Sequence, residues 1–217
     1  MNYRMTDREN FASFLMRMRA KGGVEQKVLD AIEATPRRGF VPSQWQDAAF
    51  SDRCVPIECG EVIEGLDLQA RMISELEIDP SHRVLEIGTG SGFSASVMAR
   101  LAQRVTTVDR FRSLLEHARN KMQALHIENV QFRHSDGKNG YAGEGTYDRI
   151  IVWAAFPTLP RGFLEVLASG GMMIGAIGEG VDEQVVVKLT KVGSRFERQD
   201  LFKVRFQPLA ESIATAL

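Results

Sequence analysis

Three glycines at alternate positions, Gly88, Gly90 and Gly92, follow a short apolar run and form the part of this chain best suited to bind a ligand. Glycine lets the backbone turn sharply and approach a ligand that a Cβ atom would exclude. The helix predicted to begin at Phe93 directs its free N–H groups and the positive end of its dipole to the same place, which favours an anion or carboxylate. Glycine-rich turns between strands and helices also occur for structural reasons, so the loop alone leaves both interpretations open.

An acidic residue at the end of the next apolar run favours a nucleoside ligand. This run, 104–109, is predicted to be a strand, and its last residue, Asp109, follows Gly88 by about twenty residues. At that spacing a carboxylate accepts hydrogen bonds from the hydroxyl groups of a ribose. The alternative is that Asp109 only caps the helix that follows it.

The glycine spacing and a second acid indicate which nucleoside cofactor fits. A dinucleotide fingerprint requires GxGxxG, whereas here the third glycine, Gly92, comes one residue early. Glu86 lies inside the strand before the loop, where it would repel a pyrophosphate and hold an ammonium group. A ligand with an amino group, a carboxylate and a ribose fits this pattern better. S-adenosylmethionine has all three, and its sulfonium cation tolerates nearby carboxylates.

Apolar residues recur with regular periods along most of the chain, and these periods predict the elements that position the loop. Helices are predicted at 7–20, 24–34, 66–78, 111–125 and 160–168, in addition to the one that begins at Phe93. Strands are predicted before the glycine loop and at 104–109, 130–135, 147–155 and 172–177, followed by an antiparallel hairpin of 184–192 and 200–207. Region 35–65 has no clear period, and long irregular segments in compact proteins are more often functional than idle.

The alternation of strands and helices predicts an α/β fold. We expect a doubly wound, mostly parallel seven-stranded sheet, Rossmann-like as in class I methyltransferases, with an N-terminal helical cap and a C-terminal antiparallel hairpin. A single domain is expected over 1–217, divided into a helical cap and acceptor loop (1–65), a cofactor-binding α/β core (66–182), and a hairpin with a tail (183–217). Ligands of such sheets bind at the carboxyl ends of the strands, where four residues are expected to meet: Gly88, Asp109, Asp136 and Ala154.

The composition excludes several classes of partner. The 217 residues include 27 basic and 28 acidic ones, well mixed and with a net charge of −1, so we expect no nucleic-acid partner. The first residues lack the apolar core of a signal peptide and no apolar run is long enough for a membrane helix, so we expect a cytoplasmic protein, with a monomer as the default state. Cys54 and Cys59 lack further ligands at zinc spacing, so we expect no metal and interpret both thiols as reduced and structural.

Seven stretches spread over most of the chain match one family. They are Pro-Arg-Arg-Gly-Phe-Val-Pro (36–42), Val-Pro-Ile (55–57), Gln-Ala-Arg-Met (69–72), Arg-Val-Leu-Glu-Ile-Gly-Thr-Gly-Ser-Gly (83–92), His-Ser-Asp-Gly (134–137), Tyr-Asp-Arg-Ile-Ile-Val (147–152) and Val-Arg-Phe-Gln-Pro-Leu (204–209). In these stretches the sequence resembles the protein-L-isoaspartate O-methyltransferases. The glycine loop is shared with many methyltransferases, whereas the first and last stretches are far more specific to this family.

The resemblance implies an enzyme that uses S-adenosyl-L-methionine to methylate the free carboxylate of isoaspartyl residues in damaged proteins or peptides, with S-adenosyl-L-homocysteine as product. It implies cofactor contacts to the methionine part from Glu86, Gly88, Gly90 and Gly92, to the ribose from Asp109, and to the adenine from Asp136 and Gly137. The resemblance also implies substrate contacts from Val55, Ile57, Ile63, Ala154, Ala155, Arg205 and Phe206. Taken alone, Asp136 could equally be a turn residue before glycine.

This chemistry requires little from side chains. A carboxylate with a pKa of about 4 is already ionised at neutral pH, and the positive sulfur already activates the methyl group, so no general base is needed. Catalysis would come from holding the oxygen, the methyl carbon and the sulfur in line with water removed.

One position departs from the family pattern. The family has a hydroxyl-containing Thr/Ser-Ile-Ser segment, with a proline soon after, where this chain has Val62-Ile63-Glu64-Gly65-Leu66, so Glu64 replaces the serine beside the acceptor carboxylate. An ionised Glu64 about 4 Å from that carboxylate would cost roughly 4 kcal/mol at an effective dielectric constant near 20. Three explanations remain open: Glu64 is protonated by burial and donates in place of the serine, it points to solvent, or the acceptor differs.

Two alternative functions follow from this departure. One is a divergent member of the family that methylates another acceptor. The other is a non-catalytic module that binds S-adenosylmethionine, because cofactor residues are retained beside an altered acceptor residue, Glu64. The sequence leaves open the mobility of loop 57–66.

Overall fold

A seven-stranded sheet forms the centre of the computed structural model, which describes residues 6–143, 145–180 and 182–214. Its strands are β3 (Arg83–Ile87), β4 (Arg104–Asp109), β5 (Val130–His134), β6 (Tyr147–Phe156), β7 (Leu167–Ile177), β8 (Gln184–Val192) and β9 (Arg195–Val204). The strand order is β5-β4-β3-β6-β7-β8-β9; β3 to β7 pair in parallel, and β8 is antiparallel to both β7 and β9. The predicted mostly parallel seven-stranded sheet with a terminal hairpin is therefore confirmed.

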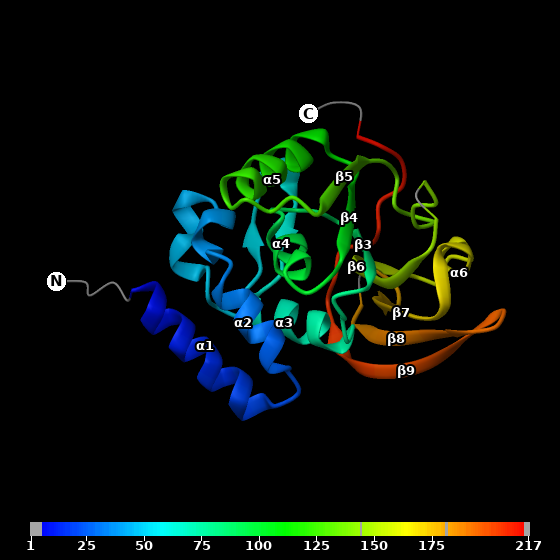
Figure 1. Cartoon of the computed structure of the whole chain (residues 1–217), viewed down its shortest axis with the longest axis horizontal. Coiled ribbons are helices and arrows are strands. Elements are labelled where there is room, and N and C mark those ends of the chain that lie inside the picture. The colour runs from blue at the N-terminus through cyan, green and yellow to red at the C-terminus, as the bar shows by residue number, and fades with distance from the viewer. Residues whose placement is uncertain (1–5, 144, 181, 215–217) are drawn as a thin grey trace.

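Helices cover the two faces of this sheet unequally (Figure 1). They are α1 (Asp7–Lys21), α2 (Gln26–Glu33), α3 (Leu66–Glu75), α4 (Phe93–Ala99), α5 (Arg112–Ala124) and α6 (Gly162–Val166). One core cluster joins side chains of α1 to α5 to one face, and a second cluster joins α6 to the other face. Side chains of β3 alternate accordingly: Val84 belongs to the first cluster, whereas Leu85 and Ile87 belong to the second.

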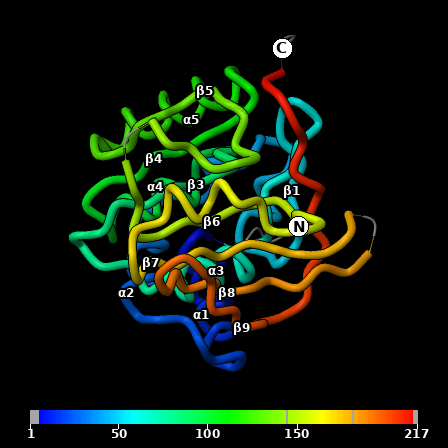
Figure 2. The backbone as a smooth tube through the Cα atoms, turned by 90° about the vertical axis from the view of Figure 1, so that its right-hand side faces the viewer, coloured from blue at the N-terminus to red at the C-terminus, as the bar shows by residue number. Residues whose placement is uncertain are grey.

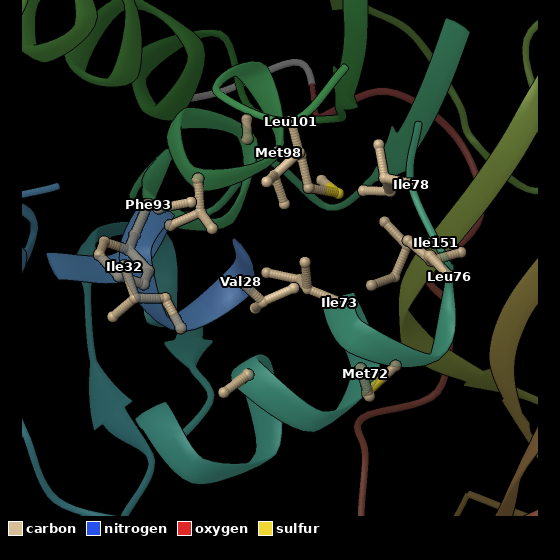
Figure 3. Close-up of a cluster of buried hydrophobic side chains, with 14 of the residues drawn as sticks. Val28, Ile32, Met72, Ile73, Leu76, Ile78, Phe93, Met98, Leu101 and Ile151 are labelled. Atoms are coloured by element: carbon tan, nitrogen blue, oxygen red, sulfur yellow. The ribbon is translucent and has the colours of Figure 1, made fainter. Parts of the chain in front are cut away.

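The first cluster fixes the helical cap on the core. Figure 3 shows Ile32 of α2 and Phe93 of α4 close together, with Ile73 of α3 pointing into the same space. These side chains are almost fully buried, and each large apolar side chain removed from water contributes about 1.5–3 kcal/mol. A capping box in which Thr6 and Glu9 exchange hydrogen bonds defines where α1 begins.

The region between α2 and α3 is irregular, as predicted. It holds three short 3₁₀ helices, at Arg37–Phe40, Ser43–Ala48 and Glu58–Gly60, and a two-stranded sheet of β1 (Val55–Pro56) and β2 (Val62–Ile63). Arg37 ties this region together from inside the protein: it is 1% exposed and donates to the carbonyl oxygens of Ala49 (3.1 Å) and Glu64 (2.9 Å) and to the side-chain oxygen of Gln69.

Some predicted boundaries were wrong. The helix predicted at 160–168 is confined to Gly162–Val166, because the chain becomes extended at Leu167 and pairs with Tyr147 of β6. The second hairpin strand, predicted at 200–207, covers Arg195–Val204, because Gly193 with a φ of 62° allows a two-residue turn that pairs Val192 with Arg195 directly. Helix α3 ends at Glu75 rather than at 78.

The segment after β9 returns across the sheet (Figure 2). The N–H of Ala155 donates to the carbonyl of Gln207 and the N–H of Leu209 donates to the carbonyl of Ala155, both at 2.9 Å. Farther on, the N–H of Ser212 donates to Oδ2 of Asp136 at 2.8 Å. Residues 207–212 therefore lie at the carboxyl ends of β6 and β5, where the ligand is expected. The predicted subdivision at 65/66 and 182/183 stays a prediction.

In the described part of the chain, none of the helices combines the length and the apolar composition that a membrane span requires.

Candidate functional site

The glycine loop connects β3 to α4 and forms part of two cavities. The larger cavity has a volume of about 320 Å³ and the smaller one about 50 Å³. Both are lined by Gly88, Gly90, Trp153 and Gln207. An added Cβ atom at Gly88 would lie 3.3 Å from Cβ of Trp153, so a side chain there would compress the contact between the loop and β6. The loop thus leaves open space at the carboxyl end of the central strand.

Asp109 lies in the wall of the larger cavity at the end of β4. Its Oδ2 accepts from the N–H of Gly90 at 3.1 Å, and its Oδ1 accepts from the N–H of Phe111 at 3.0 Å. Burial raises the pKa of this carboxyl, while its backbone donors lower it. The bond to Phe111 closes a turn just before α5, and the bond to Gly90 fixes the loop; α5 itself begins at the N-cap residue Phe111 without a side-chain cap, and the contact of Asp109 with a ribose stays a prediction.

Glu86 lies beneath the loop rather than in a cavity wall. It is fully buried, and its carboxylate accepts from Ser94 (2.5 Å), Thr107 (2.7 Å) and Nε1 of Trp153 (2.9 Å). Burial raises its pKa to about 7, although the three donors lower it. Three side chains of the protein thus occupy its oxygens, and the direct hold of Glu86 on an ammonium group stays a prediction. Since Ser94 and Trp153 line the smaller cavity, Glu86 acts on that cavity through them.

Gly92 and Asp136 also lie outside both linings. Gly92 begins α4 with a φ of 86°, and an added Cβ atom would lie 2.6 Å from Cβ of Ala118 in α5, so this glycine allows two helices to pack closely. Oδ1 of Asp136 accepts a hydrogen bond from the N–H of Lys138 at 2.8 Å, and Oδ2 accepts one from the N–H of Ser212. The bond to Lys138 is the turn contact expected if Asp136 is a turn residue before glycine. Gly137, in contrast, lines the larger cavity.

Glu64 lies at the boundary of the smaller cavity. Its side chain is buried, and Oε2 accepts a hydrogen bond from the Cys54 thiol, with Sγ and Oε2 3.0 Å apart. Burial raises the pKa of this carboxyl. The solvent-directed arrangement of Glu64 is excluded by its exposed fraction of 9%. Glu64 also lines a third, outer cavity of about 350 Å³ that opens between α3 and β9.

The structure brings only some of the predicted substrate residues to the cavities. Ile63 lines the smaller cavity, Ala154 the larger one and Arg205 the outer one. An added Cβ atom at Gly90 would lie 3.7 Å from Ile57, so Ile57 lies beside the loop. The remaining three are buried core residues that line no described cavity, because their side chains face the packed clusters: Val55, Ala155 and Phe206.

Several lining residues escaped the sequence analysis. Oγ of Ser91 and Nε of Arg110 are buried and have no hydrogen-bond partner in the structure, and they line the smaller and the larger cavity respectively. Ser91 stands within the glycine motif and so carried a signal that was not used. Gln207 lies in the family-specific stretch 204–209, but its place at the loop depends on the return of the chain after β9. Unpartnered buried polar atoms at a cavity wall indicate that a polar ligand completes the site.

No group of three or more His, Cys, Asp or Glu residues able to hold a metal ion is present within residues 6–143, 145–180 and 182–214. Cys54 and Cys59 are free thiols.

Comparison with known proteins identifies a matching family model and similar proteins. The family model described as protein-L-isoaspartate(D-aspartate) O-methyltransferase matches residues 9–214. A protein-L-isoaspartate O-methyltransferase of Rhizobium meliloti (strain 1021) is 42% identical over 202 residues, which is 93% of this chain and 99% of the relative. One of Bradyrhizobium sp. (strain ORS 278) is 41% identical over 204 residues, 94% of this chain and 95% of the relative.

A solved structure supports the architecture alone. A methyltransferase of Plasmodium falciparum, crystallised in complex with S-adenosyl-L-homocysteine, superposes with a TM-score of 0.80 and 23% identity, covering 93% of this chain and 98% of that one. The predicted class I methyltransferase fold is thereby confirmed, and the family model and the relatives cover the cap, the glycine loop and the terminal hairpin alike. The chain belongs to the protein-L-isoaspartate(D-aspartate) O-methyltransferase family.

Proposed function

We propose that this chain is an S-adenosyl-L-methionine-dependent O-methyltransferase that methylates the free carboxylate of isoaspartyl residues in proteins and peptides. Membership of the family supports the activity. Relatives about 40% identical to this chain, which match it over nearly their whole length, are named protein-L-isoaspartate O-methyltransferase. The observation that carries the proposal is the larger cavity at the glycine loop, where Asp109 and the unpartnered Nε of Arg110 lie together at the carboxyl ends of the strands.

The residues of this cavity fit the cofactor. Gly88 and Gly90 would leave room for its methionine part, Asp109 would accept from the ribose hydroxyls, and Gly137 would lie against the adenine. At Gly137 an added Cβ atom would lie 2.4 Å from Cγ2 of Ile87, so a larger residue would displace the wall. Oγ of Ser91, which has no hydrogen-bond partner in the protein, would be available to donate to or accept from the methionine part of the cofactor. Once bound, the cofactor supplies an electrophilic methyl group on a positive sulfur.

The chain contributes positioning and exclusion of water. Trp153 and Ile63 border the smaller cavity beside the loop, and their side chains would help to exclude water from the acceptor oxygen. Holding the acceptor in line, rather than deprotonating it, accounts for the rate, since the carboxylate is already ionised. We also propose the cytoplasmic location and monomeric state expected from the sequence.

The test is a methylation assay on matched peptides. The purified chain is incubated with labelled S-adenosylmethionine and an isoaspartyl peptide, with the aspartyl peptide as control, and the methanol released by base is counted. We expect release from the isoaspartyl peptide alone. Asp109→Ala should weaken the binding of S-adenosylhomocysteine at least tenfold in calorimetry, whereas Asp200→Ala, an exposed change on β9, should leave it unchanged.

Absence of methanol from the isoaspartyl peptide, with cofactor binding intact, would overturn the proposal. Methylation of other protein groups would then favour the divergent acceptor, and binding without any turnover would favour the non-catalytic module.

A further inference from the structure

Glu64 is the boundary between the space beside the glycine loop and the outer cavity. The smaller cavity, with Gly88 and Ser94 in its wall, and the outer cavity share Glu64 alone among the described residues. Any acceptor group that enters from the outer cavity toward the loop therefore passes the Glu64 carboxyl. Charged side chains, among them Arg71 and Arg205, line the outer cavity, so such an acceptor meets them before it reaches Glu64.

The backbone around Glu64 is tightly fixed. The carbonyl oxygen of Glu64 accepts a hydrogen bond from Nη2 of the buried Arg37 at 2.9 Å. Two residues farther along, the N–H of Leu66 donates to the carbonyl oxygen of Ser51 at 2.9 Å. Between them, Gly65 packs so closely that an added Cβ atom would lie 2.3 Å from the backbone of Asp52. The carboxyl is thus held at the boundary by its own main chain.

The described surroundings give the Glu64 carboxyl no ion-pair partner. The titratable and charged groups lining the two cavities or contacting Glu64 are Lys21 on α1, Arg37, Asp52 and Cys54 in the irregular region, Glu61 beside β2, Asp67 and Arg71 on α3, Lys203 on β9, and Arg205 after it.

The cations of this group have other contacts or lie in the outer cavity. Lys21 pairs with Asp67 at 2.7 Å and Lys203 pairs with Glu183 at 2.8 Å. Arg71 stacks over the ring of Phe202, with Cζ 3.9 Å from the centroid. Arg37 spends its donors on two carbonyl oxygens and on Gln69.

Among the described residues, the hydrogen-bond partner of the carboxyl is the Cys54 thiol, a neutral donor. Burial raises the pKa of the Cys54 thiol to about 12, and its hydrogen bond to Glu64 raises it as well, so the thiol keeps its proton. A single thiol bond stabilises a buried charge weakly, whereas a protonated carboxyl can accept from Cys54 and still donate through its second oxygen. Burial also raises the pKa of Glu64.

We infer that Glu64 works in its protonated form and donates a hydrogen bond to the acceptor carboxylate, so that binding of the acceptor is coupled to the uptake of one proton. This inference rests on the proposed function. Two carboxyl groups in one buried site share a proton because both cannot be ionised at close range. Arg71 and Arg205 place positive charge in the outer cavity, which favours an anionic acceptor on its way to Glu64.

The proton on Glu64 takes no part in the bonds of methyl transfer, so atoms and charges balance in that step without it. A bond forms between the acceptor oxygen and the methyl carbon, and the bond from that carbon to sulfur breaks, so the negative charge of the acceptor and the positive charge of the sulfur both disappear. The proton stays on Glu64 during this step. It can leave afterwards, because the transfer has removed the second negative charge that held it.

The first test measures proton uptake directly. The chain saturated with S-adenosylhomocysteine is titrated with an isoaspartyl peptide at pH 8 in two buffers of different ionisation enthalpy. We expect the uptake of about one proton per peptide bound. Binding without proton uptake would overturn the inference, even though it would leave the proposed function intact.

The second test compares pH profiles of kcat/KM for methylation of the same peptide between pH 5.5 and 8.5. The unchanged chain should lose up to tenfold per pH unit in the alkaline range, because the active form binds one more proton. Glu64→Gln keeps a neutral donor at all pH values, so its profile should vary less than twofold; Glu64→Ser supplies a hydroxyl donor and should behave alike. Glu61→Gln, in the wall of the smaller cavity, is the matched control and should keep the slope.

The outcomes separate the two proposals. A flat profile for the unchanged chain, or the same slope after Glu64→Gln, overturns the role of Glu64 while methylation continues. No methylation by the unchanged chain, Glu64→Gln or Glu64→Ser at any pH, with S-adenosylhomocysteine still bound, overturns the proposed function and this inference with it.

Discussion

Gly92→Ala should destabilise the protein more than any other single methyl group added to the glycine loop. Two costs combine there: a left-handed φ of 86°, which costs a residue with a Cβ atom roughly 1–2 kcal/mol, and a contact of 2.6 Å with Cβ of Ala118, whose relief costs about 1–3 kcal/mol. The sum is about 2–5 kcal/mol. For a protein of this size it corresponds to a fall in Tm of roughly 4–20 °C.

Other glycines of the chain separate the two costs. Gly193 has a φ of 62° and no atom within 4 Å of an added Cβ. Gly193→Ala therefore measures the cost of the backbone conformation alone, at about 1–2 kcal/mol. Gly137→Ala has an ordinary φ and a contact of 2.4 Å with Ile87, so it measures the packing cost alone. Gly39→Ala has neither and should change stability by less than about 1 kcal/mol. Thermal unfolding followed by circular dichroism compares all four variants.

A compensating change makes the reasoning refutable. Ala118→Gly removes the obstructing methyl group, so adding it to Gly92→Ala should recover about 1 kcal/mol, which is the relief of about 1–3 kcal/mol less the cost of about 0.5–1 kcal/mol for glycine inside a helix. If Gly92→Ala is no less stable than Gly193→Ala, the packing argument is wrong. If the Gly92→Ala variant keeps its stability but loses affinity for S-adenosylhomocysteine, Gly92 contacts the cofactor and does not merely allow α4 to pack on α5.

Three further changes test the buried polar groups. Because burial raises the pKa of Glu86 to about 7 from its ordinary 4.5, the folded state binds this proton more tightly, so its contribution is fully favourable below about 4.5 and is lost as pH rises to about 7. Stability curves of the unchanged protein and Glu86→Gln should therefore diverge by about 3 kcal/mol over that range, and parallel curves would contradict the assignment. Gln184→Leu removes the amide that bonds the N–H and carbonyl of Phe206, and should cost about 2–4 kcal/mol in urea unfolding; a cost below 0.5 kcal/mol would argue against that pairing. Arg37→Lys cannot reproduce the bonds to three acceptors, so it should cost about 2–4 kcal/mol by the same measurement, whereas an unchanged midpoint would show that the planar guanidinium is not required.

The order and type of the central elements could be predicted from the sequence because they rest on local patterns. Buried parallel strands are continuous apolar runs, and the regular alternation with amphipathic helices leaves few topologies. The positions of Gly88, Gly90 and Asp109 at one cavity followed from this alternation alone. The limits of α6 and β9 did not, because they depend on pairing with β6 and β8, which are distant in sequence or separated by a turn.

The contacts of individual side chains could not be predicted where a neighbour in space decides them. Glu86 was expected to reach a ligand, but Ser94, Thr107 and Trp153 come from three other elements and occupy its oxygens. Gly92 was expected in the cradle; the structure adds its close packing against Ala118, and its contact with the cofactor stays a prediction. Such partners lie on separate elements, and no periodicity in one sequence reveals which of them will meet.

The wall that residues 207–210 add to the larger cavity connects the site to the order in which the chain is synthesised. The glycine loop, Asp109 and the parallel strands are made first, and Gln207 and Leu209 can pair with Ala155 only after the hairpin has left the ribosome. Until then the cavity lacks the wall that residues 207–210 provide. Because a ligand stabilises only the state that binds it, the cofactor can assist the last step of folding but not the earlier ones.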